Sequence, residues 1–121
     1  MRDHTKLKAF ALADELALLT YKETRAFPSE ERFALVAQMR RAALSTASNI
    51  VEGCARSTEA GYLHFLDMAF GSSRELEYQI PLAHRLGYLD PPANERMAVA
   101  SESTCKVLGA LIRSLRNTSD E

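Results

Sequence analysis

The stretch SEERFALVAQMRRAALSTASNIVEGCAR, residues 29–56, predicts one long helix with two neighbouring apolar sectors and a polar stripe. These classes of side chain separate around the axis at about 100° per residue. The first apolar sector holds Leu35, Met39, Ala42, Ala43, Thr46, Ile50 and Cys54, and the second holds Phe33, Val36, Leu44, Ala47 and Val51. The polar stripe holds Gln38, Arg41, Ser45, Asn49 and Glu52. Because one apolar stripe is enough for a core-facing helix, the second sector predicts an additional contact, and we expect it to lie between subunits.

The rest of the chain has the composition of a helical globular domain. Only 5 Gly and 4 Pro interrupt 121 residues, and the hydrophobic fraction of 46% is sufficient for a packed core. The net charge of −1 gives no general attraction to nucleic acid or anionic lipid, so such binding would need a local basic patch. No signal-peptide pattern and no apolar run of about 18 residues is present, so we expect a cytoplasmic protein without a membrane contact.

Hydrophobic periodicity predicts four helices. Short connections between them imply that neighbouring helices run antiparallel. We therefore expect an all-α, up-down-up-down four-helix bundle that occupies residues 1–121 as a single domain. Ser57 or Thr58 is expected to start the third helix, Gly87 is its expected C-terminal cap, and Pro81 predicts a kink or a break within it. The predicted helices span approximately residues 5–26, 29–55, 58–87 and 91–116.

The polar stripe of the second helix has a counterpart on the third, where Ser72, Glu75 and Gln79 follow at helical spacing. Facing each other, the two stripes would pair Arg41 with Glu75 and Asn49 with Ser72. Three interpretations are open: a satisfied polar seam that sets helix register, a groove that binds a ligand or partner, and an active site. The first is favoured, because no histidine lies near Ser45 to serve as its general base.

Other chemistry-bearing residues are scattered. His64 and Asp67 stand three apart on the third helix, which is a weak metal-binding pattern that a metal-dependent enzyme would have to use. Cys54 and Cys105 form no CxxC motif and are expected to be small core residues in a reducing compartment. The sequence thus predicts no catalytic residue, no metal site and no cofactor.

Arginines offer the one route to a charged partner. Arg40 and Arg41 are adjacent and therefore point about 100° apart, while Arg74 and Arg85 lie on the outer side of the third helix. A solvated face is the simpler interpretation. The alternative is that Arg40, Arg74 and Arg85 contact RNA or DNA when an oligomer repeats them.

Several strings of this sequence resemble one bacterial family. The most specific is Arg41-Ala-Ala-x-Ser-x-x-x-Asn-Ile-x-Glu-Gly53, and it is supported by Leu7-x-Ala-Phe10, by Ala69-x-Gly-Ser-x-x-Glu-Leu76 and by Leu86-Gly-Tyr88. Over about residues 6–90 the order and spacing of these strings resemble the family called 23S rRNA intervening-sequence proteins, to which accessory proteins of diversity-generating retroelements are related. This chain has Phe10 where Trp is usual and Thr46 where Ile is usual.

The resemblance implies a non-enzymatic four-helix bundle that assembles into a ring, typically of five subunits. It also implies that Arg41, Ser45, Asn49, Glu52, Ser72 and Glu75 form the signature seam of the family. The retroelement relatives bind nucleic acid through a basic surface, whereas this chain is nearly neutral. We therefore expect a homo-oligomeric scaffold or interaction protein, with nucleic-acid binding as the alternative.

Overall fold

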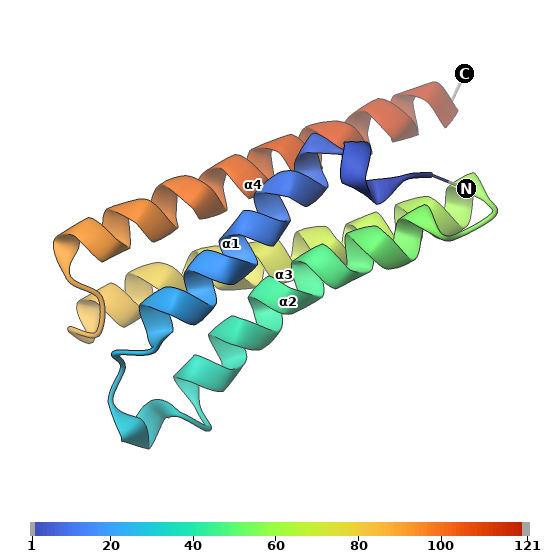
Figure 1. Ribbon diagram of the computed structural model, residues 1–121. Helices are drawn as coiled ribbons and strands as arrows, with labels where there is room; N and C mark the ends of the chain where they lie inside the picture. Colours follow the sequence, from blue (N-terminus) through green and yellow to red (C-terminus); the bar gives the residue numbers. More distant parts are fainter. Residues whose placement is uncertain (1, 120–121) are drawn as a thin grey trace.

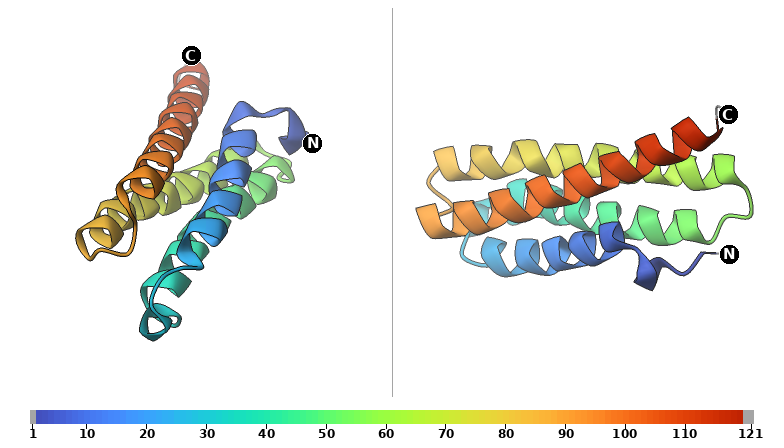
Figure 2. Two further views of the ribbon diagram at one scale, coloured as in Figure 1. Left: turned by 60° about the vertical axis from the view of Figure 1, so that its left-hand side comes forward. Right: turned by 90° about the horizontal axis from the view of Figure 1, so that it is seen from above.

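The computed structural model describes residues 2–119, and within that range the protein is a bundle of four α-helices without a β-strand. The helices are α1 (Lys8–Thr24), α2 (Leu35–Cys54), α3 (Glu59–Arg85) and α4 (Pro91–Ser119). Successive helices run in opposite directions, so both ends of the chain lie at the same end of the bundle (Figures 1 and 2). The predicted all-α, up-down-up-down fold is confirmed, although Met1, Asp120 and Glu121 of the expected domain lie outside the described residues.

The second helix begins later than predicted. Ser29–Glu31 form a 3-10 turn, η2, and α2 starts only at Leu35, because Ala34 has φ −117° and ψ −103°, outside the helical region. The turn is held by a distant residue, Tyr88, whose hydroxyl donates to Glu31 Oε2 at 2.8 Å. The prediction of one continuous helix from Ser29 is therefore wrong for its first six residues.

Shorter differences occur at the first helix. It begins at Lys8 instead of residue 5, because His4–Lys6 form a separate 3-10 turn, η1, whose N-cap is Asp3. The Asp3 carboxylate accepts from the backbone N–H of Thr5 at 3.0 Å. At the other end α1 stops at Thr24, two residues before its predicted end.

The residues at the two ends of α3 cap the helix as their local chemistry predicts. Thr58 Oγ1 accepts from the backbone N–H of Gly61 at 3.0 Å and so caps α3. At the opposite end Gly87 has φ +82°, and the N–H groups of Gly87 and Tyr88 return to carbonyls of the last helical turn in a Schellman motif. Helix α3 continues through Pro81 without the break that the sequence had left open.

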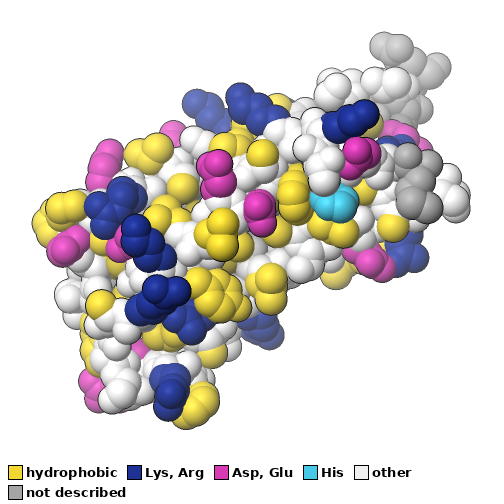
Figure 3. Space-filling view, in the orientation of Figure 1, with side chains coloured by type: hydrophobic (Ala, Val, Ile, Leu, Met, Phe, Trp, Pro, Cys, Tyr) yellow, Lys and Arg dark blue, Asp and Glu magenta, His cyan; other side chains and the backbone are white. Residues whose placement is uncertain are grey.

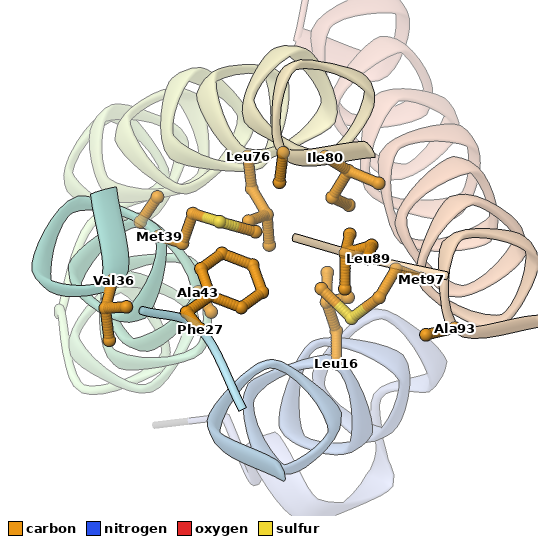
Figure 4. Packing of buried hydrophobic residues seen from close by; sticks show 12 residues of the cluster. Leu16, Phe27, Val36, Met39, Ala43, Leu76, Ile80, Leu89, Ala93 and Met97 are labelled. Atoms are coloured by element: carbon orange, nitrogen blue, oxygen red, sulfur yellow. The ribbon is translucent and has the colours of Figure 1, made fainter. Parts of the chain in front are cut away.

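The core consists of two apolar clusters stacked along the bundle. One cluster gathers Leu16, Met39, Leu76 and Met97 from the four helices, with Phe27 inserted from the α1–α2 connection (Figure 4). The other lies toward the end of the bundle that carries the chain termini, and contains Ala9, Ala13, Ala47, Ile50, Cys54, Tyr62, Leu66, Ala69, Leu108 and Ile112. The helices are therefore held together along most of their length.

In α2, α3 and α4, small hydroxyl side chains lie between the residues of one cluster and those of the other. The fully buried ones at this level are Thr46, Ser73, Ser101 and Thr104. The two threonine hydroxyls donate to carbonyl oxygens four residues earlier, at 2.8 Å, and Ser73 donates to the carbonyl of Phe70 at 2.8 Å. Ser101 Oγ alone of the four has no hydrogen-bond partner among the described residues.

Candidate functional site

The predicted polar seam lies between α2 and α3, where it lines a small hollow of about 230 Å³. Arg41 and Ser45 contribute from α2, and Ser72 and Glu75 contribute from α3. Both helices bring these residues together by the same means, since steps of three and four residues return a side chain to one edge of a helix. The sequence thus identified four of the residues that line this hollow, and Ala42 is the fifth.

Ser45 is the centre of the hydrogen bonding in the seam. Its hydroxyl oxygen accepts from Ser72 Oγ and from Asn49 Nδ2, both at 2.9 Å, and its carbonyl oxygen accepts a second bond from Asn49 Nδ2. The expected direct bond between Asn49 and Ser72 is wrong, because Ser45 lies between them and bridges the two helices. All three side chains are half-buried, which makes this the inner part of the seam.

The expected ion pair between Arg41 and Glu75 is not formed. Arg41 Nη2 donates to Gln38 Oε1 at 2.7 Å, and Gln79 Nε2 donates to Glu75 Oε1 at 3.3 Å. Each charged group is thus held by an amide on its own helix, three or four residues away. Gln79 is 7% exposed, and its Oε1 atom has no partner among the described residues.

Glu52 belongs to a different contact. Its carboxylate forms an ion pair with Arg56, one turn further along the chain, and the Arg56 guanidinium lies 4.6 Å from the centre of the Phe65 ring. Glu52 therefore does not line the hollow, although the sequence pattern placed it on the same stripe. Through Arg56, Glu52 belongs to a contact between the end of α2 and Phe65 of α3.

The seam offers polar contacts but no activated nucleophile. His64 packs edge-on against Phe65, and Asp67 is paired with Arg116, so the weak His64–Asp67 metal pattern has its carboxylate engaged. No group of three His, Cys, Asp or Glu side chains that could hold a metal occurs within residues 2–119. No helix in the same range is long and apolar enough to cross a membrane.

Both cysteines are buried and lack a thiolate-stabilising environment. Burial raises the pKa of the Cys54 thiol, and burial likewise raises the pKa of the Cys105 thiol. Cys105 Sγ donates to Ser73 Oγ at 3.3 Å. Since the thiolate is the reactive form of cysteine, neither residue is set up for nucleophilic chemistry.

The second apolar sector of α2 divides into exposed and buried residues. Phe33, Leu44 and Val51 are 88%, 51% and 36% exposed, so they are available to another chain. Val36 and Ala47 are buried in the two core clusters, so they offer little surface for the intersubunit contact that the sequence predicted for them. The whole sector was assigned outward because periodicity does not show how far the neighbouring helices wrap around α2.

The candidate nucleic-acid residues differ in their surroundings. Arg40 is fixed against α1, where Nε donates to Thr24 Oγ1 at 2.9 Å and the guanidinium lies 4.7 Å from the centre of the Tyr21 ring. Arg74 is within 3.4 Å of Glu77 on its own helix, and Arg85 is exposed. No contact among the described residues joins these three arginines into one patch.

A charged hollow that the sequence did not reveal lies between α3 and α4. Arg74, Lys106 and Arg113 line it around the half-buried ring of Phe70. The carboxylates of Glu77 and Glu102 line it as well, so three cations lie beside two anions. Gly109 makes room for this arrangement, because a Cβ there would lie 3.3 Å from Phe70 Cε1 and 3.4 Å from Arg113 Nη1. Lys106 and Arg113 are seven residues apart and therefore share a helix face, which is the signal that could have identified them.

Comparison with solved structures shows the same fold in a protein of unknown function from the S23 ribosomal protein family of Bacteroides thetaiotaomicron. The TM-score is 0.79 at 23% sequence identity, and the match covers 87% of this chain and 95% of the other. No curated protein gives a significant match. A family model described as 23S rRNA-intervening sequence protein matches residues 5–110. The fold and the length of this match agree with the resemblance carried by the seam residues, and the chain belongs to the 23S rRNA-intervening sequence protein family.

Proposed function

We propose that this protein is a non-catalytic scaffold or interaction protein that works as a homo-oligomer, with a five-membered ring as the expected assembly. The observation that carries the proposal is the exposure of Leu44 and Val51 on the outer side of α2. They are seven residues apart and so lie on one line along the helix. Aligned aliphatic side chains of this size on the outside of a bundle favour contact with another chain.

The free energy available from this line is moderate. Burying a half-exposed leucine or valine contributes roughly 1 kcal/mol, so these two side chains supply only part of a stable contact. The polar seam beside them supports the rest of the proposal. Arg41 and Glu75 are exposed and not paired with each other, and they can form hydrogen bonds and ion pairs at the rim of an interface.

Light scattering coupled to size exclusion tests the proposal. The native protein should have a mass several times 13.5 kDa, and about five times for a ring of five subunits. Leu44→Glu and Val51→Glu should lower that mass while the helical circular dichroism stays unchanged. The matched control is Leu86→Glu, because Leu86 is 50% exposed but lies at the end of α3. A native monomer at micromolar concentration would remove the proposal.

Nucleic-acid binding is the second candidate function, and the hollow between α3 and α4 favours it. Arg74, Lys106 and Arg113 outnumber the two glutamates there and lie beside an aromatic ring, which suits a phosphate backbone and an unstacked base. The affinity for structured RNA or duplex DNA should then fall steeply with salt. Fluorescence anisotropy of wild type against the Lys106→Glu, Arg113→Glu double variant tests this. Equal binding by both proteins, or none at low ionic strength, would eliminate the candidate.

A further inference from the structure

A long apolar groove runs between α1 and α4. Its volume is about 640 Å³, and Leu12, Leu19, Val99 and Ala100 form its apolar lining. Figure 3 views this face and shows hydrophobic side chains along both helices with acidic side chains among them. Val99 is 54% exposed although it lies inside α4, two turns from its start. The groove is therefore an unfilled apolar surface on the side of α1 that is turned toward α4.

The same chain carries an exposed apolar side chain that could fill such a groove, Phe33, which we call the knob. Phe33 is 88% exposed, the highest value of any large hydrophobic residue described, and it lies in the connection between η2 and α2. An aromatic ring of this kind contributes a large apolar area when it is buried, because it can be covered on both faces and at its edge. Within residues 2–119 its ring is approached by one charged group, the Arg32 guanidinium, 5.6 Å from the ring centre.

The charges around knob and groove are complementary. Glu15 and Glu95 line the groove without an ion pair among the described residues, while Arg96 is already engaged by Glu23 at 3.1 Å. On the knob side, residues 25–40 contain three arginines and two glutamates, a net charge of +1, and one of those glutamates is hydrogen-bonded to Tyr88. A groove with free carboxylates thus matches a corner with excess arginines.

We propose that Phe33 of one copy inserts into the α1–α4 groove of the next copy, with Arg32 beside the carboxylates of Glu15 and Glu95. This inference rests on the proposed homo-oligomer and adds a second pair of surfaces to the line of Leu44 and Val51. Because the proposed assembly is a five-membered ring, the contact between these two different surfaces is head-to-tail. Each copy then donates one Phe33 and accepts another, and repetition of the same contact closes a ring when the rotation between copies permits it.

Two single variants each remove one side of the contact. Phe33→Glu replaces the knob by a negative charge that the groove carboxylates repel. Val99→Lys puts a cation in the groove that repels the arginines of the corner, and Glu95 four residues earlier keeps the helix itself stable. Both positions are exposed, so circular dichroism should be unchanged. Each variant alone should sediment as a monomer, whereas the control Leu86→Lys should keep the native mass.

Mixing the two variants tests whether the knob of one copy meets the groove of another, as opposed to each surface meeting its own counterpart. The Val99→Lys chain still carries Phe33, and the Phe33→Glu chain still carries an intact groove, so one good contact can form between them. Extension would require the substituted position 33 to fill the substituted groove, and no aromatic ring is left there to bury. Sedimentation velocity of the equimolar mixture at high concentration should therefore show a species of twice 13.5 kDa.

The outcomes separate this inference from the proposed function. If both single variants keep the native mass, the groove has another occupant, such as a different protein or a small apolar molecule, and the inference fails while the homo-oligomer stands. If the variants are monomeric but their mixture gives no dimer, Phe33 and the groove do not meet and the inference also fails. A monomeric wild type would overturn both.

Discussion

Two buried serines of equal exposure should respond in opposite ways to the same substitution. Ser101 and Ser73 are both 0% exposed and both lie in the middle of long helices. Ser101 Oγ has no partner among the described residues, whereas Ser73 Oγ donates to the carbonyl of Phe70 and accepts from Cys105 Sγ. Replacing either by alanine removes one oxygen atom, so the difference between the variants reports the hydrogen bonds.

The magnitudes follow from three contributions. Alanine gains about 0.5 kcal/mol over serine in a helix interior, and this gain is common to both positions. A buried hydroxyl without a partner costs about 1–3 kcal/mol, and at the lower end of this range Ser101→Ala should raise the free energy of unfolding by about 1.5 kcal/mol. Ser73→Ala loses a hydrogen bond and leaves the Cys105 thiol without its acceptor, and the free energy of unfolding should fall by about 1 kcal/mol.

Urea unfolding followed by circular dichroism measures both changes. The protein concentration must be the same for all variants, because assembly adds to the apparent stability. The two midpoints should move in opposite directions at constant m-value, with thermal midpoints separated by about 8 °C for a chain of this size. Two shifts of the same sign, or two of zero, would refute the reasoning from hydrogen bonds.

Two further predictions concern backbone and thiols. Gly87→Ala should lower the free energy of unfolding by about 1 kcal/mol, because φ is +82° there. Gly71→Ala should raise the free energy of unfolding by about 0.5–1 kcal/mol, because Gly71 is an exposed position of α3 where an added Cβ meets no other atom. Urea unfolding measures both changes. The pKa values of Cys54 and Cys105 are raised by burial, so above about pH 8.5 the unfolded chain ionises first and the free energy of unfolding falls. A Cys54→Ala, Cys105→Ala double variant should show a flatter fall between pH 8 and 10 in the same assay, and an unchanged slope would contradict the shift.

Local sequence was sufficient for features that depend on neighbours along the chain. Thr58 caps α3 because its hydroxyl needs only the N–H three residues on, and Gly87 ends the helix because only glycine adopts that backbone angle without strain. The core sector of α2 was predicted for the same reason, since helical periodicity is set within two turns. The four-helix fold follows once these elements and their short connections are known.

Contacts between distant residues explain what the sequence did not predict. The start of α2 is displaced because Tyr88 holds Glu31 in a 3-10 turn, and the two residues are 57 positions apart. In the seam, Arg41 and Glu75 were expected to pair across two helices, but each bonds to an amide on its own helix. A partner one turn away is always within reach, whereas a cross-helix partner depends on the exact helix separation, which periodicity does not encode.

The bond from Tyr88 to Glu31 also bears on how fast the proposed assembly would form. Together with the Phe27 ring, 5.3 Å from that of Tyr88, it fastens the connection before α2 to the far corner between α3 and α4. A surface loop of this length would ordinarily lose conformational entropy on binding. Here that entropy is already lost in folding, so Phe33 is presented on a backbone fixed in advance. Tyr88→Phe, which touches neither proposed surface, would loosen the corner and reduce the association rate more than it alters the final complex.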